Sequence, residues 1–383
     1  MNDKRLLIVG ASVRAAAFSA RRSGFDPECA DLFADADLTA LCNAVAVANY
    51  PDDLQAIIEQ SASNEWIYTG ALENRPDLLN NWAKSKCLLG NAAETVRAIR
   101  NPFVLQDCLK RNGLPTPCAK SELATTDNQS QWIRKPFSSA SGLDVDIASS
   151  ETPRDGVEYF FQEFIQGDPQ SAVFVGAKQQ AQFLGATKQL IGTDWCGVEK
   201  FRYAGSIGPI GMESNEFELW NQIGSKLAAE FDLKGLFGVD AIVNDDGIWT
   251  IEVNPRYTAS IEILESADPN VNSIYRHVTA CRNQMFVPFR QREQIDVYYA
   301  KAILFAKRPL CVSPALVDRL LRENERSDLP RIADIPHAGT IEAGWPILTV
   351  FGKGDSLTKA ENDAKNRVLA IKASLESSNL IRP

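Results

Sequence analysis

Histidine is scarce in this sequence of 383 residues. His277 and His337 are the only two, and neither lies in an H-x-x-x-H or H-E-x-x-H pattern. We therefore expect neither a zinc site built from histidines nor a nucleophile activated by one. Runs of five basic residues are also missing, and 49 Asp and Glu outnumber 40 Lys and Arg, which gives a net charge of −9. This balance argues against nucleic acid as a partner.

Long hydrophobic runs and paired cysteine motifs are missing as well. No stretch approaches the roughly 18 consecutive apolar residues of a membrane span. The apolar run after the charged N-terminus covers only residues 6–9, which is too short for a signal peptide. The eight cysteines form no C-x-x-C pair. These absences predict reduced thiols in a cytoplasmic protein that has no membrane partner.

The composition is that of an ordinary globular protein, with 45% hydrophobic and 23% charged residues. A chain of this length predicts two or three domains of roughly 100–200 residues each. Within residues 1–91, short apolar runs alternate with helical segments; the runs lie at 5–9, 29–33, 41–47 and 66–69, and the helical segments at 13–23, 52–63 and 75–84. This alternation predicts an α/β unit with a Rossmann-like parallel sheet.

Residues 92–283 form a second unit, in which the strands are expected to be antiparallel. Strands are predicted at 132–136, 158–165, 172–175 and 182–186, and a long amphipathic helix at 213–231. Two apolar strands flank Asn244-Asp-Asp-Gly247, and this pattern predicts a β-hairpin. Residues 284–383 are expected to be a small α/β subdomain that packs on the second unit, with strands at 297–306 and 347–351 and helices at 314–323 and 357–375.

The predicted hairpin carries the strongest chemical signal. Asp240 lies on its first strand, and Glu252 and Asn254 lie two residues apart on the second, so these two project to the same face. Two carboxylates and an amide oxygen are ligands that suit Mg²⁺. The alternative is a set of polar residues on a solvent-facing sheet. That alternative explains poorly why an acid lies within such apolar strands, because an unpaired buried carboxylate is costly.

A loop and a hinge suggest phosphate and adenine contacts. Lys135 ends a predicted strand and precedes a loop of small residues that includes Ser138, Ser139 and Gly142. Small residues let backbone N–H groups approach phosphate oxygens, and a lysine at the strand end can reach them. Many strands end in this way without binding anything. The apolar segment 160–165, followed by Gly167, could hold a flat adenine ring.

Two turns of the first unit could contact a substrate. The turn Gly10-Ala-Ser12-Val-Arg14 lacks the further glycines of a dinucleotide fingerprint, but Ser12, Arg14 and the following helix N-terminus could meet an anion. Thr69, Gly70 and Glu73 follow a predicted strand at the edge where open α/β sheets bind ligands. For both turns the alternative is a structural turn that binds nothing.

In this order, the segments resemble the ATP-grasp enzymes over nearly the whole chain. Residues 237–256 are especially similar to biotin carboxylase and carbamoyl-phosphate synthetase. The resemblance implies an α/β and α+β architecture in three parts: a Rossmann-like domain at 1–91, an antiparallel ATP-grasp domain at 92–283 and a small C-terminal subdomain at 284–383. It also implies ATP and Mg²⁺, or Mn²⁺, as cofactors, and is compatible with a homodimer.

The resemblance assigns roles residue by residue. Asp240, Glu252 and Asn254 would hold the metal, and Arg256 would stabilise the transferred phosphoryl group. Family members often have a lysine near Asn101-Pro102, for which Arg100 is the nearest substitute. Asp168 is an alternative to Gln170 at the ribose. Lys200 could reach the γ-phosphate, and a solvated surface lysine is the alternative for it. The nucleotide contacts implied are Arg100, Lys135, Ser138, Ser139, Gly142, Gln162, Glu163, Phe164, Ile165, Gln170 and Lys200.

The activity implied is that of a carboxylate–amine ligase acting on small molecules. A substrate carboxylate attacks the γ-phosphate of ATP to give an acyl phosphate, and an amine then forms the C–N bond, with ADP and phosphate as products. Two alternatives stay open: a carboxylase or carbamoyl-type enzyme that uses carboxyphosphate, and an ATP-binding regulatory protein without turnover. Residues 9–17, 29–38, 68–74 and 162–165 are similar to ATP-dependent carboligases near tyramine–glutamate ligase of methanofuran biosynthesis, which suggests a link to methanofuran or pterin one-carbon cofactors.

Overall fold

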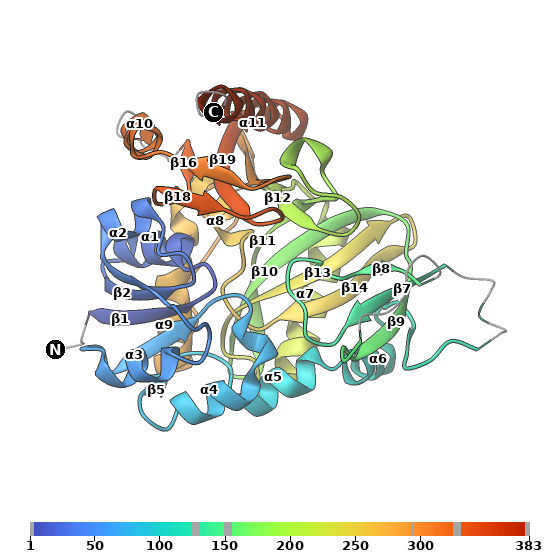
Figure 1. Ribbon diagram of the computed structural model, residues 1–383. Coiled ribbons are helices and arrows are strands. Elements are labelled where there is room, and N and C mark those ends of the chain that lie inside the picture. Colours follow the sequence, from blue (N-terminus) through green and yellow to red (C-terminus); the bar gives the residue numbers. More distant parts are fainter. Residues whose placement is uncertain are drawn as a thin grey trace.

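The computed structural model describes residues 4–124, 127, 131–148, 155–292, 294–324 and 331–379. In Figure 1, the N-terminal sheet (blue) lies on one side of a large sheet (green and yellow), and the C-terminal elements (orange to red) continue that large sheet. None of the described helices is both long and apolar enough to cross a membrane.

The N-terminal segment forms a parallel sheet, as predicted. Within the described residues its strand order is β3-β2-β1-β4-β5. The elements are β1 Arg5–Gly10, α1 Arg14–Arg22, β2 Asp26–Asp31, α2 Ala36–Leu41, β3 Asn43–Ala46, α3 Leu54–Gln60, β4 Glu65–Tyr68, α4 Pro76–Trp82 and β5 Cys87–Leu88. Leu6 and Ile8 belong to one buried cluster, and Leu7 and Val9 belong to another. Strand β1 is therefore covered on both faces, which explains its continuous apolar run.

The large sheet is antiparallel and joins the second and third segments of the chain. Its order among the described strands is β14-β13-β10-β11-β12-β15-β19-β17. The bounds are β10 Asp168–Ala177, β11 Gln180–Ile191, β12 Tyr203–Gly208, β13 Gly235–Asn244, β14 Gly247–Asn254, β15 Tyr298–Phe305, β17 Ile332–Ala333 and β19 Pro346–Gly354. Asn244 pairs with Gly247, so the predicted hairpin is present. Strands β15, β19 and β17 continue the sheet beyond β12, and residues 284–383 therefore share this sheet with the second segment of the chain.

Strand β12 escapes sequence-based prediction because glycine interrupts its apolar pattern. A side chain at Gly205 would place its Cβ atom 1.9 Å from the carbonyl oxygen of Lys301 on β15. Glycine at this position therefore reflects the close approach of two strands rather than a loop.

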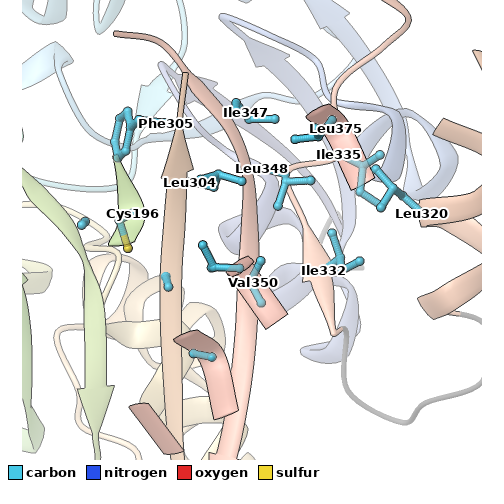
Figure 2. Packing of buried hydrophobic residues seen from close by; sticks show 14 of the residues in the cluster. Cys196, Leu304, Phe305, Leu320, Ile332, Ile335, Ile347, Leu348, Val350 and Leu375 are labelled. Atoms are coloured by element: carbon cyan, nitrogen blue, oxygen red, sulfur yellow. The ribbon is translucent and has the colours of Figure 1, made fainter. Parts of the chain in front are cut away.

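A smaller antiparallel sheet and several helices complete the fold. The small sheet has the order β6-β9-β7-β8, with β6 Ala119–Lys120, β7 Trp132–Pro136, β8 Asp146–Ile147 and β9 Tyr159–Glu163; a further pair is β16 Leu310–Val312 with β18 Gly339–Ile341. The other helices are α5 Ala93–Arg100, α6 Pro102–Arg111, α7 Ser214–Phe231, α8 Ile261–Ala267, α9 Ser273–Asn283, α10 Pro314–Asn324 and α11 Leu357–Asn379. Helix α11 packs on β15 and β19, where Leu304 and Val350 line the buried cluster of Figure 2.

A buried ion-pair network joins all three parts of the chain. Arg14 on α1 donates to both carboxylate oxygens of Glu262 on α8, at 2.6 and 2.8 Å, and to Oδ1 of Asp334 at 2.8 Å. Lys301 on β15 donates to Glu262 at 2.7 Å. Burial alone would raise the pKa of Glu262, but Arg14 and Lys301 lower it to about 2. Glu262 is therefore charged at neutral pH, and the cations of Arg14 and Lys301 compensate its charge inside the protein.

Removing the cation of this network should destabilise the protein. In Arg14→Met the packing volume is largely kept, but Glu262 and Asp334 lose their shared partner, and breaking a buried pair in this way costs about 3–5 kcal/mol. Arg21→Met is the matched control on the same helix, because Arg21 forms an exposed ion pair with Asp26 and such pairs contribute at most about 1 kcal/mol. Chemical unfolding of the two variants measures the difference.

The pH dependence gives this comparison a second readout. The pKa of Glu262 is lower in the folded protein than the ordinary value of 4.5. Its ionisation therefore contributes stability above about pH 4.5, and this contribution disappears as the pH falls toward 2. The difference in free energy of unfolding between Arg14→Met and Arg21→Met should therefore become smaller as the pH falls from about 4.5 toward 2. Equal, small losses in both variants at pH 7 would contradict a stabilising role for the network.

Candidate active site

The β13–β14 hairpin brings the three predicted metal ligands together. Asp240 pairs directly with Glu252 in the register, next to a bulge, and Asn254 lies at the end of β14. The Asn254 amide Nδ2 donates to Oδ2 of Asp240 at 3.0 Å and to Oε1 of Glu252 at 3.2 Å. The structure therefore places these three side chains on one face, as their spacing predicts.

Cations from two other elements face this cluster. The Nζ atom of Lys135, at the end of β7, lies 3.8 Å from Oε2 of Glu252, and a guanidinium nitrogen of Arg100 on α5 lies 3.6 Å from the same oxygen. Lys135 also donates to Oε1 of Gln162 at 3.3 Å, and the Gln162 amide donates to the carbonyl of Ile251 at 3.3 Å. Gln162 was predicted among the adenine contacts, but the structure places it between Lys135 and the hairpin.

The two carboxylates of the hairpin have opposite pKa shifts. Burial and the neighbouring charge of Glu252 raise the pKa of Asp240 to about 7. Burial also acts to raise the pKa of Glu252, but Arg100 and Lys135 outweigh it and lower that pKa to about 2. Glu252 therefore carries the negative charge at neutral pH, while Asp240 is poised to ionise. A divalent cation would favour ionisation of Asp240.

The donor set fits a hard cation. It consists of oxygen ligands, and the repulsion between Asp240 and Glu252 is the kind that a bound Mg²⁺ relieves. Within the part of the chain that the structure describes, no three side chains of His, Cys, Asp or Glu are arranged to hold a metal. The candidate site therefore depends on Asn254 as its third ligand, and its amide must turn over to offer the oxygen, because Nδ2 now faces the two carboxylates and Oδ1 accepts from Arg256.

Sequence reasoning missed Gln189 as a neighbour of this cluster. Its amide on β11 donates to Oδ1 of Asp240 at 3.1 Å, and the Ser171 hydroxyl on β10 also forms a hydrogen bond that stabilises the Asp240 carboxylate. These contacts depend on which strands lie side by side in the large sheet. No local signal in the sequence identifies them.

Arg256 connects the hairpin to the N-terminal segment. Its guanidinium donates to Oε1 of Glu73 at 2.5 Å and to Oδ1 of Asn254 at 3.3 Å. Glu73 is only 3% exposed, and its other oxygen, Oε2, is buried without a hydrogen-bond partner. A Cβ atom at Gly70 would lie 3.4 Å from the guanidinium carbon of Arg256, so the absence of a side chain leaves room there. Glu73 and Gly70, predicted as substrate contacts, thus lie beside Arg256.

The predicted phosphate loop lies close to Arg100. The backbone carbonyl of Ser139 accepts hydrogen bonds from Asn74 at 3.2 Å and from Arg100 at 3.4 Å. Gly142 has a positive φ of 70°, and a Cβ atom there would lie 2.0 Å from the carbonyl oxygen of Phe201. Both constraints require glycine. Ser138 lies in the same loop, just after β7.

Lys200 is not brought to this cluster of charges. It donates to Oδ1 of Asp146 at 2.7 Å, and its side chain is 52% exposed. This position agrees with the alternative of a solvated surface lysine rather than with a γ-phosphate contact.

The segment predicted to hold adenine, residues 160–165, consists of most of β9 and the two residues that follow it. The Glu163 backbone N–H donates to the carbonyl of Cys118, and the Phe164 N–H donates to that of Gln131. The Phe164 ring is exposed and packs edge-on against Phe201, and Ile165 is half-buried. The hinge therefore presents apolar groups of the kind that a flat base requires.

The two predictions for the ribose differ in their surroundings. Gln170 is buried, and its Oε1 has no hydrogen-bond partner. Asp168 is exposed and pairs with Lys188 at 3.2 Å. An unpartnered buried acceptor is costly unless a ligand or water satisfies it, which favours Gln170 as the ligand contact.

The predicted anion site at the turn after β1 is corrected by the structure. The backbone N–H of Val13, at the start of α1, donates to Oδ2 of Asp31 at 2.6 Å. The Arg14 side chain, 1% exposed, is occupied by Glu262 and Asp334. A carboxylate of the protein itself therefore takes the place in which a substrate anion was expected. The Ser12 carbonyl accepts from the Thr69 hydroxyl at 2.9 Å, so these residues hold two loops together.

The comparisons with known proteins agree with this geometry. A family model described as an ATP-grasp domain matches residues 99–260. The chain carries an ATP-grasp domain. A relative from Methanocaldococcus jannaschii, itself uncharacterised, is 24% identical over 379 residues, which covers 91% of this chain and 88% of the relative.

Solved structures show a similar fold over nearly the whole chain. An L-amino acid ligase from Bacillus licheniformis has a TM-score of 0.69 at 13% identity and covers 97% of this chain and 98% of its own. A biotin carboxylase from Campylobacter jejuni, solved with an ATP analogue, has a TM-score of 0.70 at 12% identity, with coverage of 96% and 94%. N5-carboxyaminoimidazole ribonucleotide synthetase from Thermotoga maritima has a TM-score of 0.64 at 14% identity, with coverage of 95% and 98%.

Lys135 of the ATP-grasp domain offers a direct test of nucleotide binding. In Lys135→Ala, ATP should bind more weakly by roughly 1–3 kcal/mol, about a 5- to 150-fold loss in affinity, because a charge-assisted contact to phosphate is removed. Lys178→Ala removes an exposed lysine in the β10–β11 turn and should leave the affinity unchanged. Isothermal titration measures both. Unchanged ATP affinity in Lys135→Ala would show that the phosphates bind elsewhere.

Asp240 offers a test through pH. Its pKa is raised in the folded protein, so the stability that it contributes is full below about pH 3.8 and is lost as the pH rises through about 7. Without metal, Asp240→Asn should therefore be more stable than the wild type at pH 8, and the two should differ less at pH 5. Added Mg²⁺ should raise the melting temperature of the wild type at pH 8 and leave that of the variant nearly unchanged. A variant that is less stable than the wild type at pH 8 would contradict the assigned repulsion.

Proposed function

We propose that this protein is an ATP-dependent carboxylate–amine ligase that forms C–N bonds between small molecules. The observation that carries the proposal is the pairing of Asp240 with Glu252 on the hairpin, opposite Lys135 and Arg100. Enzymes that transfer the γ-phosphate of ATP need such an arrangement, with oxygen ligands for a metal and cations for the phosphates. The L-amino acid ligase of similar fold supports a ligase rather than another use of ATP.

The metal and the nucleotide would be held from opposite sides of the site. Asp240, Glu252 and Asn254 would hold Mg²⁺, which would neutralise charge on the phosphates of ATP when bound. Lys135 and Arg100 would bind phosphate oxygens in place of their present contact with Glu252. Glu252 would keep a positively charged partner in this exchange, because the metal would take the place of Lys135 and Arg100.

The reaction proceeds in two balanced steps. A substrate carboxylate attacks the γ-phosphorus of ATP, and the bond between this phosphorus and the oxygen that bridges to the β-phosphate breaks. An acyl phosphate forms, and ADP is released. An amine then attacks the acyl carbon, phosphate leaves, and the amine loses a proton. Arg256 faces Glu73 and Asn254 in the structure, and from there its guanidinium would stabilise charge on the transferred phosphoryl group.

Glu73 supports an amine as the second substrate. Its buried carboxylate has a lowered pKa, because Arg256 outweighs the effect of burial, and its Oε2 has no partner. A charged carboxylate with one free oxygen next to Arg256 is suited to accept a hydrogen bond from an N–H group of the incoming amine. The narrower resemblance directs the first substrate screen to glutamate with tyramine and then to precursors of methanofuran and pterin cofactors.

Catalysis of this kind needs no histidine. Both ring nitrogens of His277 are engaged, with Nδ1 accepting from the Leu236 N–H at 2.8 Å and Nε2 lying 2.9 Å from the Leu89 carbonyl oxygen. Burial lowers the pKa of His277 to about 4, so the ring is neutral. Its role is to connect α9 with two strand ends. The homodimer and the cytoplasmic location stay predictions.

The central test is turnover of a variant without the Glu252 charge. Glu252→Gln keeps the size of the side chain but should lower ATP-dependent phosphate release at least ~100-fold, the scale of losing a preorganised electrostatic contact. Asp245→Asn, in the exposed turn of the same hairpin, removes a carboxylate outside the cluster and should keep wild-type turnover. Rates measured against Mg²⁺ concentration complete the comparison.

Each outcome discriminates between the proposed ligase and its alternatives. Near-normal activity of Glu252→Gln with an unchanged Mg²⁺ midpoint would rule out the metal site. Turnover that requires bicarbonate would favour the carboxylase or carbamoyl-type alternative. ATP binding without phosphate release, over a screen of acids and amines, would favour a regulatory protein.

A further inference from the structure

Two cysteines 13 residues apart in the sequence meet in the N-terminal segment. Cys29 lies in the middle of β2 and Cys42 directly follows α2; their Sγ atoms are 3.6 Å apart. Cys29 is 3% exposed and packs in a core cluster, whereas Cys42 is half-buried at its edge. We propose that Cys29 and Cys42 form a reversible redox site, at which a low-molecular-weight disulfide converts the two thiols into an internal disulfide.

The two thiols have complementary properties. The contact between the two thiols lowers the pKa of Cys42, and the charge of Arg21 acts in the same direction against burial. Cys29 shows the opposite shift, because the same contact and its burial raise its pKa. A half-buried thiol with a lowered pKa is the better nucleophile, and a buried neighbour in contact with it can act as the resolving thiol.

The chemistry is a balanced exchange of two electrons. The Cys42 thiolate attacks one sulfur of the small disulfide, the S–S bond breaks, and the first small thiol leaves. Cys29 then loses its proton, attacks the Sγ atom of Cys42 and displaces the second small thiol. Two protein thiols are oxidised, and one small disulfide is reduced to two thiols.

The loop that this bond would close is the one that docks the C-terminal segment. The Ala36 N–H donates to the carbonyl of Ile335 at 2.7 Å, and the Asp37 carboxylate accepts from the backbone N–H groups of Asp334 and Ile335 at 3.1 and 3.0 Å. The ring of Phe33 packs edge-on against Trp345. All these contacts come from residues between Cys29 and Cys42. A disulfide between Cys29 and Cys42 would therefore close residues 30–41, the docking loop, into a covalent loop. It would restrict the motion of these residues when their contacts to the C-terminal segment open.

The experiment uses the folded full-length protein and glutathione disulfide as the probe. Incubation should remove two thiols from the eight in the chain, and peptide mapping should identify a Cys29–Cys42 cross-link that dithiothreitol reverses. Cys29→Ser should instead trap one glutathione on Cys42, and Cys42→Ser should leave Cys29 unmodified. Cys87→Ser removes an exposed thiol at β5 and should leave the cross-link unchanged.

Two outcomes would overturn the proposal. The first is glutathione on Cys87 or Cys311 without any Cys29–Cys42 cross-link in the folded wild type. The second is a cross-linked protein whose amide exchange in residues 30–41 and 331–340 is not slower, and whose melting temperature is not higher by a few degrees, than in the reduced protein. That result would show that the disulfide does not restrict the motion of the docking loop. Neither readout depends on the ligase activity.

Discussion

Two carboxylates that face each other on paired strands set the main constraint on this structure. Directly opposite residues on antiparallel strands have Cβ atoms about 4.5–5.5 Å apart, and like charges in such a pair repel. The hairpin can hold Asp240 opposite Glu252 because other elements supply compensation. Lys135 comes from the small sheet, Arg100 from α5, and Arg256 from the chain just beyond β14. The positions of these elements around the large sheet are coupled through this charge balance.

The hairpin shows why part of the site is predictable from the sequence. Residues 244–247 fix the turn, and a spacing of two fixes the common face of Glu252 and Asn254, so both follow from local rules. Gln189 does not, because it reaches Asp240 only through the register of β11 in a sheet whose strand order is not encoded locally. Sequence-based prediction misses β12 for the same reason, because its glycines reflect the close approach of another strand rather than a turn.

Arg14 illustrates the opposite case, in which a local pattern points to the wrong partner. A basic residue after a glycine turn, at the start of a helix, is typical of an anion site. Its partners Glu262 and Asp334 lie more than two hundred residues further along the chain, and Asp31 already occupies the helix N-terminus. The helix itself was predicted correctly from its apolar pattern. Its charged end could be interpreted only when the three parts of the chain were seen together.

The continuation of the large sheet into the C-terminal segment has a consequence for how the protein could have been assembled in evolution or divided in the laboratory. A chain ending near residue 283 would lack β15, β19 and β17, so the outer side of β12 would present unpaired backbone N–H and C=O groups. Such an open edge is a template for pairing with another molecule. The segment expected to bind the nucleotide, residues 92–283, could therefore not be separated from the rest of the chain without exposing this sheet edge. The last hundred residues protect its edge from self-association.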